Sequence, residues 1–595
     1  MNTKTFEVES SLDAPTVEEK EGKASATHHL GEVEPAPAHH SLVAPDGGQA
    51  TVTLKTWIAI WILSASFGIS FWPVPTTGAM GQALATKFGD VQSAPWIVPA
   101  YTVSIAISQM LCGGNSDLFG RRWFLIGGNI ICLIGYIVAA TANTTKQLVA
   151  AMVLLGFGGG LCVFEAEVAM WAIPELLPNK WRHIGVVIAD TCVFFAVVVG
   201  PIVGRIVIDD GGNTWRWVYI AGAIATCGSG LGLYWCYFPP AHPRGVPFWE
   251  AIHGMDWVGM FLFTAGFAIT MSGIINTTYI DASNVRVIAT LCVGFGVMIL
   301  FGLWEQFGTI TYPLCPTHVF TRNHGRTFTA PFVVGIVLGM VYYAINIIYP
   351  TCINVFYVGA DTPRSEQLAL TLPGNLGLTF GGVLLVIFGE RLRHFRLQLN
   401  VTLAGTVLFG GLIAVVTPDN KGTIIAFTFL EQMFYGWSVY LCYTYVQQGV
   451  DQIELGIAGG LCGVMRFVGG SLAQAIYTTV LVNKQGSEAR KLIPQAALAA
   501  GLPPSSLDAF MAAFPTNTTQ LGQITGVDTA VLAAAGEAFQ LSYAHALKIL
   551  ALVSVAFGGL AIAVCVTVEN IDPKMNDQIE VFLENDKLAD KNVYH

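Results

Sequence analysis

Five ionisable residues lie inside long apolar stretches of the chain, and proton transfer and charge pairing are the chemistry that they could perform. They are four acids and one base: Glu165, Glu167, Asp190, Glu431 and Arg466. A charged side chain at the centre of a lipid bilayer costs about 2.5–3.5 kcal/mol on insertion scales, so each of them requires a physical reason. A carboxyl can bind and release a proton, whereas a guanidinium can pair with an acid or with an anionic or carbonyl-bearing ligand.

Asp190 and Glu165 are the acids best placed for proton binding. Each stands roughly seven or eight residues from the same end of its expected helix, about 10–12 Å deep. Neighbouring carboxylates in a low dielectric disfavour each other's charge, so one of them can hold a proton near neutral pH. Glu167 points about 200° away from Glu165, so both cannot face one cavity. We expect Asp190, and then Glu165, to carry protons; the alternative is a carboxyl hydrogen-bonded between helices for structural reasons.

Arg466 stands about eleven residues into its expected helix, near the bilayer midplane. It can pair with Glu431 across two helices, or it can contact a substrate. Aromatic residues share these apolar stretches and would line a weakly polar cavity suited to a bulky amphipathic molecule. They are Trp61, Phe71, Trp72, Trp96, Tyr101, Phe194, Tyr342, Tyr343, Tyr435, Trp437, Tyr440 and Tyr443.

The elements that position these residues are membrane-spanning helices. Of 595 residues, 53% are apolar and 11% are charged, whereas soluble domains carry about 25% charged residues. Buried backbone amides in lipid require helices or closed barrels, and the apolar runs show no strand-like alternation. We therefore predict an all-α membrane protein. About fourteen spans are expected, near 57–78, 94–113, 123–141, 148–173, 184–208, 216–237, 256–275, 286–305, 328–350, 366–389, 397–416, 422–446, 456–481 and 545–568.

The distribution of charged residues differs between the tails and the centre of the chain, and it predicts the orientation of the chain in the membrane. The formal net charge of −10 comes from the two tails, which argues against a nucleic-acid partner. Basic residues favour the side of the membrane that also holds both tails, so we expect cytoplasmic termini. Three glycosylation sequons, at Asn143, Asn276 and Asn517, fall on the opposite side, whereas the sequon at Asn400 falls on the inner side and should be unused.

Two motifs lie at the ends of expected helices. The connection 113–122 reads Gly113-Gly-Asn-Ser-Asp117-Leu-Phe-Gly120-Arg121-Arg122, in which glycines allow a tight turn, and an acid followed by two arginines can form an ionic latch. A degenerate echo, Gly389-Glu-Arg-Leu-Arg-His-Phe-Arg396, recurs eight spans later and indicates repeated halves. The fifth span ends with Gly200, Pro201 and Gly204, which predict a kink and close helix packing. Gly156–Gly160 has no following Lys-Ser/Thr, so helix packing explains it better than phosphate binding.

The first motif resembles the loop signature of the major facilitator superfamily, and the second resembles the antiporter motif of its proton-driven efflux branches. The stretches 175–182, 215–217, 465–470 and 569–573 narrow this to the fungal trichothecene efflux pump family and the similar siderophore–iron transporters. The resemblance covers about residues 50–590. It implies that Asp117, Arg121 and Arg122 lock an outward-open state. Many drug:proton antiporters carry an arginine where this chain has Met152, which puts proton coupling through that arginine in doubt.

The resemblance implies two six-helix halves with two extra central helices. We expect a disordered cytoplasmic tail (1–54), an N-terminal half (55–240), two linking helices (241–320), a C-terminal half (321–568) with an extracellular loop over 483–543 and short amphipathic helices, and a second cytoplasmic tail (569–595). No cofactor or metal is expected. We expect a monomer in the cell membrane.

Proton-coupled efflux of a hydrophobic toxin, metabolite or drug is the function that we predict. The alternative is proton-coupled uptake of ferric siderophores, which shares the fold. A membrane enzyme would need histidine clusters within spans, and none occurs in the sequence. A channel or receptor would show uncoupled flux or none. An ATP-driven pump is excluded because there is no phosphate-loop motif and no large soluble domain. The protein is therefore not predicted to be an enzyme.

Overall fold

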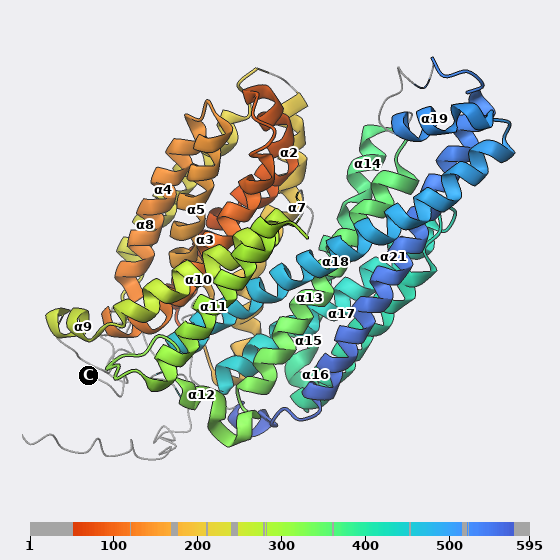
Figure 1. Cartoon of the computed structure of the whole chain (residues 1–595). Helices are drawn as coiled ribbons and strands as arrows, with labels where there is room; N and C mark the ends of the chain where they lie inside the picture. Colours follow the sequence, from red (N-terminus) through yellow and green to blue (C-terminus); the bar gives the residue numbers. More distant parts are fainter. Residues whose placement is uncertain are drawn as a thin grey trace, which may run out of the picture. The chain divides into compact units, whose positions relative to one another are not determined.

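The computed structural model is built from helices, and no β-strand is assigned within the residues that it describes. Thirteen of the described helical segments are long and apolar enough to cross a membrane, which agrees with the predicted all-α membrane fold. Figure 1 shows the helices along the chain. The structure describes residues 52–119, 121–167, 177–209, 212–239, 248–277, 280, 283–359, 362–451, 454–514, 521 and 523–575.

The first group of helices precedes residue 240. It comprises α1 (Leu54–Phe71), α2 (Pro73–Phe88), α3 (Ile97–Phe119), α4 (Arg121–Ala140), α5 (Thr145–Glu167), α7 (Arg182–Asp209) and α8 (Arg216–Cys236). The hydroxyl of Thr53 caps α1 by accepting a hydrogen bond from the Thr56 N–H at 3.3 Å. Pro73 lies at the first position of α2, where a missing N–H costs nothing.

Small residues let α3, α4 and α5 pack closely, as expected for Gly156–Gly160. A Cβ added at Gly156 would lie 2.4 Å from the Tyr101 carbonyl oxygen on α3. One added at Gly158 would lie 2.6 Å from the Cys132 nitrogen on α4. Real Cβ atoms do not approach so closely, so both neighbours depend on the absence of a side chain. The glycine run is therefore a packing face.

Two further long helices follow, side by side in Figure 1, and they connect the two groups. They are α10 (Trp257–Asn276) and α11 (Val285–Phe307), flanked by the short α9 (Phe248–Gly254) and α12 (Thr317–Thr321). Asp256 caps α10 by accepting a hydrogen bond from the Gly259 N–H at 2.8 Å. Of the two, α10 also packs on α3 and α18.

The second group follows residue 320. It comprises α13 (Thr329–Cys352), α14 (Arg364–Leu370), α15 (Leu372–Leu392), α16 (Phe395–Leu412), α17 (Lys421–Gln448), α18 (Leu455–Ala499), α19 (Leu507–Ala513) and α21 (Thr529–Cys565). The predicted twelfth span is α17, which is long enough to cross a membrane but more polar than the thirteen spans. Its polar residues, Glu431 among them, explain why its apolar signal is weak.

Short turns of other helix types join these elements in the described part of the chain. They are η1 (Ala94–Trp96), η2 (Asn179–Trp181), η3 (Arg322–Gly325), η4 (Ile353–Tyr357), η5 (Ile413–Val415), η7 (Pro504–Ser506) and η8 (Asp572–Lys574). Asn323 and His324, inside η3, both adopt positive φ angles, near 48° and 54°. This left-handed backbone turns the chain sharply before α13.

The segment 483–543, expected as an extracellular loop with short amphipathic helices, contains the short α19 and also the extensions of two long helices. Helix α18 continues for 45 residues to Ala499, about 67 Å at 1.5 Å per residue, whereas a bilayer core is about 30 Å thick. Helix α21 begins at Thr529 and is 37 residues long. A separate apolar cluster, which includes Ile493, Phe510 and Val531, packs these extensions with α19. The extensions support each other in this way, which loop composition alone did not indicate.

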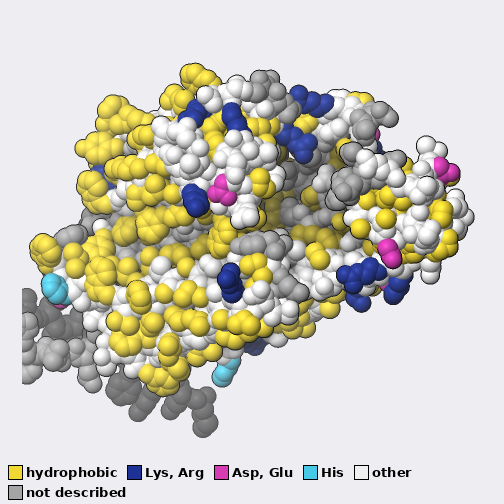
Figure 2. Space-filling model, turned by 45° about the horizontal axis from the view of Figure 1, so that its top comes forward, with side chains coloured by type: hydrophobic (Ala, Val, Ile, Leu, Met, Phe, Trp, Pro, Cys, Tyr) yellow, Lys and Arg dark blue, Asp and Glu magenta, His cyan; other side chains and the backbone are white. Residues whose placement is uncertain are grey.

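Apolar side chains are exposed on the outer surface of the helices. Figure 2 shows them over broad areas of one face, while Lys and Arg gather in smaller groups. Trp235 and Phe261 are each 72% exposed, and Ile224 is 69% exposed. An apolar surface of this extent is expected of a protein whose solvent is lipid.

Candidate functional site

A hydrogen bond between two helices holds the carboxyl of Asp190. Helix α7 carries Asp190, which is 4% exposed, and α17 carries Tyr440, which is 2% exposed. The Tyr440 hydroxyl donates to Asp190 Oδ2 at 2.8 Å, while Oδ1 is buried without a hydrogen-bond partner. The ring of Phe194, one turn along α7, meets the Tyr440 ring edge to face at 6.1 Å between centroids. Asp190 therefore lies in a dry, aromatic contact between the first and second groups.

Arg466 of α18 is the cation close to this carboxyl. Its positive charge acts on Asp190 and on Tyr440. It acts also on Tyr342 of α13 and Tyr435 of α17, whose rings stack at 4.9 Å between centroids and 20° between planes. The predicted positions of Asp190 and Arg466 thus converge on one aromatic cluster. Pairing of Arg466 with Glu431 and contact with a substrate both stay predictions.

Glu431 lies one turn along α17 from Tyr435 and is fully buried. Gln432 Nε2 donates to Glu431 Oε2 at 2.8 Å, while Oε1 is buried without a hydrogen-bond partner. Tyr342 is within electrostatic reach of Glu431, Arg466 and Asp190 together. Of the two stacked tyrosines, Tyr342 therefore lies within reach of both acids, and Tyr435 lies within reach of Glu431. A carboxyl in such surroundings is stable when it is neutral or is compensated by nearby charges and dipoles.

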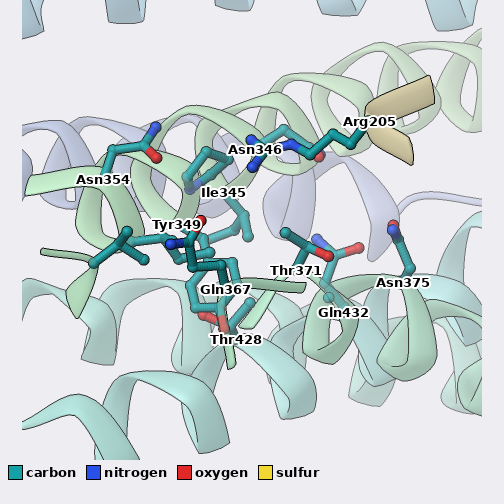
Figure 3. Close-up of a pocket in the computed structure, with 14 residues that line it drawn as sticks. Arg205, Ile345, Asn346, Tyr349, Asn354, Gln367, Thr371, Asn375, Thr428 and Gln432 are labelled. Atoms are coloured by element: carbon teal, nitrogen blue, oxygen red, sulfur yellow. The ribbon is translucent and has the colours of Figure 1, made fainter. Parts of the chain in front are cut away.

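A cavity of about 230 Å³ adjoins Gln432 (Figure 3). Its lining is rich in side-chain amides, which both donate and accept hydrogen bonds. A guanidinium, from Arg205 of α7, also lines it, and no carboxylate does among the described lining residues. The lining residues are Arg205, Ile345, Asn346, Tyr349, Pro350, Ile353, Asn354, Val358, Gln367, Thr371, Gly374, Asn375, Thr428 and Gln432.

The amide-lined cavity was missed by sequence reasoning. Thr428 and Gln432 are four residues apart and so share one face of α17, and Thr371 and Asn375 have the same spacing at the start of α15. In Figure 3 Gln432 lies beside Thr371 and Asn375. Pairs of polar residues at helical spacing inside apolar segments are the sequence pattern that could have indicated this cavity.

The first motif lies at one end of the helices, here called the motif end, where α3 ends and α18 begins. A Cβ added at Gly113 would lie 3.2 Å from the Gly456 carbonyl oxygen and 3.3 Å from the Gly460 Cα. Arg122 donates through Nη2 to the Tyr234 carbonyl oxygen at 2.8 Å, and its guanidinium lies 3.8 Å from the centre of the Phe238 ring. Arg122 therefore ties α4 to the end of α8.

Other motif residues are only partly described. Arg121 is 9% exposed in the first turn of α4. Gly120 and the side chain of Asp117 lie outside the described residues, so the ionic latch of the first motif stays a prediction.

The two groups also meet at the motif end, where η2 and α7 lie against α15. Lys180 Nζ lies 3.6 Å from Glu390 Oε1, an ion pair that is partly exposed. A Cβ added at Gly389 would lie 3.1 Å from the His183 ring, and one at Gly382 would lie 3.4 Å from a Val187 methyl carbon. The echo of the motif, 389–396, is therefore part of a contact between the groups.

The second motif packs α7 on α2 near the opposite end. A Cβ added at Gly200 would lie 2.9 Å from the Pro75 ring, and one added at Gly204 would lie 2.6 Å from the Thr76 carbonyl oxygen. Pro201 lies inside α7. This contact explains the two glycines, while a role in antiport stays a prediction.

Several predicted residues lie apart from this cluster. The side chains of Glu165 and Glu167, and all of Asn517, lie outside the described residues. Asn143 lies between α4 and α5, where its Oδ1 accepts from Arg216 Nη2 at 2.9 Å, and Asn276 ends α10. Met152 is fully buried in the core. Among the described residues no group of three His, Cys, Asp or Glu could hold a metal ion.

Comparison with known proteins agrees with this architecture. A family model described as "Fungal trichothecene efflux pump (TRI12)" matches residues 76–595. The chain is 40% identical to the MFS-type transporter prx5 of Penicillium rubens over 89% of this chain and 94% of that protein. It is 26% identical to the trichothecene efflux pump TRI12 of Fusarium sporotrichioides over 85% of this chain and 84% of that protein.

Among solved structures, the proton:xylose symporter XylE shares the fold. The TM-score is 0.52 at 11% sequence identity, and the match covers 85% of this chain and 96% of that chain. At this identity the similarity concerns the fold alone. The motifs, the helices and the two sequence comparisons together show that this chain belongs to the fungal trichothecene efflux pump family of major facilitator transporters.

Proposed function

We propose that the protein exports a hydrophobic toxin or secondary metabolite in exchange for protons. The observation that carries the proposal is the buried hydrogen bond from Tyr440 to Asp190, within reach of Arg466. A titratable group that bridges two packed groups of helices can link protonation to their arrangement. The family name supports export as the direction.

Protonation of Asp190 would change the strength of its interactions with Tyr440 and Arg466. When Asp190 is ionised, the Tyr440 hydrogen bond is charge-assisted and Arg466 attracts the carboxylate. When Asp190 binds a proton, both interactions weaken. Protonation would therefore loosen the connection between α7 and α17, and the protonated and ionised forms would favour different arrangements of the two groups.

The amide-lined cavity is the substrate site that we propose. Its amides and hydroxyls can hydrogen-bond oxygen-bearing groups, while Ile345, Ile353 and Val358 offer apolar contact. Gln432 lines the cavity and also donates to Glu431. A bound molecule that competes for the Gln432 amide would weaken the hydrogen bond from Gln432 to the buried Glu431. Substrate binding would then affect a second proton-binding candidate.

The contacts between the two groups of helices at the motif end indicate which side of the transporter is closed. Lys180–Glu390, His183–Gly389 and Gly113–Gly460 all lie at the motif end. If the motif end is cytoplasmic, as the basic residues there predict, these contacts close the cytoplasmic side. We propose that this is the outward-open state, with Asp117, Arg121 and Arg122 as its latch.

We further propose that the protein acts as a monomer in the cell membrane with both termini in the cytoplasm. Glycosylation at Asn143, Asn276 and Asn517 would then be extracellular. Siderophore uptake gains no support from the family or from the relatives named above.

Transport into sealed vesicles tests the proposed function. The purified full-length protein is reconstituted, a pH gradient is imposed, and accumulation of a tritiated trichothecene is followed. We expect accumulation against the concentration gradient that disappears when a protonophore collapses the pH gradient. Equal accumulation with and without the gradient, over a panel of hydrophobic metabolites, would contradict proton coupling.

A further inference from the structure

Two buried carboxyls meet at the motif end of the linking helices, away from Asp190 and Glu431. Asp256 caps α10 and is 5% exposed, and Glu305 lies in the last turn of α11 and is 8% exposed. Trp304, the residue before Glu305, donates to the Asp256 carboxyl at 2.8 Å, and the two carboxyl groups are close enough to interact electrostatically. Like charges this close to each other in a buried site repel strongly, so the pair cannot be explained by two ionised acids.

One oxygen of each carboxyl already has N–H donors. Asp256 Oδ1 accepts from the Gly259 N–H at 2.8 Å and from Trp304 Nε1 at 2.8 Å. Glu305 Oε1 accepts from the Leu314 N–H at 3.2 Å. These donors fix both carboxyl planes and leave the second oxygen of each group without a donor.

The remaining oxygens, Asp256 Oδ2 and Glu305 Oε2, are both buried without a hydrogen-bond partner. A buried acceptor without a donor costs about 1–3 kcal/mol, and two such acceptors side by side would also repel each other. A single proton removes both costs, because a protonated carboxyl donates to its ionised neighbour.

We propose that Asp256 and Glu305 form a proton-binding site in which one proton is shared between Asp256 Oδ2 and Glu305 Oε2. Solvent supplies the proton, and no other bond forms or breaks. Neither acid belongs to the cluster around Asp190, so this proposal does not depend on proton-coupled export.

The shared proton would fasten three segments beside the first motif. Asp256 holds the start of α10 and, through Trp304, the end of α11, while Glu305 holds the segment 308–316. That segment reaches α3, since a Cβ added at Gly114 would lie 3.6 Å from the Pro313 carbonyl oxygen. The Asn115 amide also contacts Met260 Sδ of α10 at 3.7 Å. Proton binding here is thus linked to the packing of the linking helices against the motif end of α3.

Other titratable groups near the pair are few in the described residues. The Cys315 thiol lies close enough to interact with Glu305, and burial raises the pKa of that thiol, so it is neutral at physiological pH. Tyr312 packs against Gly254, and His253 of α9 is exposed and hydrogen-bonded to the Trp249 carbonyl oxygen at 2.7 Å. The two carboxyls are consequently the groups whose charge changes with pH in the buried part of this site.

The test uses the full-length protein in lipid nanodiscs, with thermal unfolding measured across pH and infrared difference spectra recorded in parallel. Glu305→Gln replaces the shared proton with an amide donor. We expect wild-type Tm to fall by several degrees as pH rises and the proton leaves, and E305Q to lose most of that fall. The carbonyl stretch of a protonated acid should also be weaker in E305Q than in wild type at neutral pH.

Controls separate this site from general charge effects. Glu250→Gln removes an exposed acid from α9 at the same end and should leave the pH profile unchanged. Asp256→Asn keeps an oxygen for capping and should reproduce the E305Q profile, so it serves if E305Q is poorly recovered. A pH profile in both variants that matches wild type, or spectra in which neither variant loses protonated-acid signal, would overturn the proposal.

Discussion

The Tyr440 hydroxyl lies 2.8 Å from Asp190 Oδ2 and joins α17 to α7 in a site with almost no exposure to solvent. The two residues are 250 positions apart in the sequence. Because the donor and the acceptor belong to different groups of helices, the bond strains or breaks if the groups separate.

Tyr440→Phe should shift the pH profile of transport to higher pH. The hydroxyl favours ionised Asp190, and a hydrogen bond to a charged group is worth about 1.5–3 kcal/mol. Since 1.36 kcal/mol corresponds to one pH unit, its loss should let Asp190 keep its proton to a pH roughly one to two units higher. Tyr445→Phe is the matched control, because Tyr445 is buried on the same helix and its hydroxyl has no hydrogen-bond partner. Identical profiles for Y440F and Y445F would contradict the role of the bond.

Removing amides from the cavity should weaken substrate binding. Asn375→Ala removes one amide from the lining, and a lost hydrogen bond of about 1 kcal/mol raises the half-saturating concentration by about fivefold. Gln432→Leu should have at least this effect and should also change the pH dependence of binding, because Gln432 donates to Glu431. Equilibrium binding of a tritiated trichothecene at several pH values measures both effects.

The control for the cavity variants is Gln474→Leu. Gln474 is an amide on α18 that is hydrogen-bonded to Thr478 and does not line the cavity. If N375A and Q432L bind as well as Q474L at every pH, the cavity is not the substrate site.

Gly460→Val should prevent the contact between α3 and α18 at the motif end. A Cβ at Gly460 would lie 2.8 Å from the Gln109 carbonyl oxygen and 3.1 Å from the Gly113 Cα, and backbone on both sides leaves no room to adjust. We expect G460V to reach the membrane but to transport at less than about a tenth of the wild-type rate, since overpacking costs roughly 1–3 kcal/mol. Gly228→Val is the control, because no atom lies within 4 Å of a Cβ placed there. Wild-type transport by G460V would show that the close contact is dispensable.

Sequence patterns predicted the helical membrane fold and most helix positions, because a long apolar segment in lipid must form backbone hydrogen bonds within itself as a helix or within a closed barrel. They also placed Asp190 and Arg466 inside expected helices, since depth follows from helical rise, but they matched Asp190 with Glu165 and Arg466 with Glu431. Patterns could not reveal Tyr440 as the partner of Asp190, because tyrosines are frequent in these spans and the contact joins helices distant in sequence.

The extension of α18 and α21 into the segment 483–543 was not predicted, for a similar reason. Its alanines and polar residues lack the apolar signal of a span, yet α18 and α21 continue through it because they pack on each other and on Phe510 of α19. Long-range packing of this kind overrides local composition. The cavity was missed for a related reason, since its described lining comes from five α-helices and η4, and no single stretch of sequence contains enough of it to indicate a site.

Asn143 should carry a glycan if the end opposite the motif faces the outside. Asn143 lies in a short exposed turn between α4 and α5, whereas Asn400 lies inside α16 near its motif-end start. Endoglycosidase should therefore increase the gel mobility of the wild-type protein. This increase should be smaller for Asn143→Gln and unchanged for Asn400→Gln. A shift that depends on Asn400 and not on Asn143 would reverse the proposed orientation.

Substitution of Asp190 by Asn tests the central claim most directly, because asparagine keeps the shape of the side chain but cannot bind or release a proton. In reconstituted vesicles, D190N should lose accumulation driven by a pH gradient, while it still exchanges tritiated trichothecene for unlabelled trichothecene across the membrane. Gradient-driven accumulation by D190N at the wild-type level would contradict the assignment of Asp190 as the proton-coupling residue.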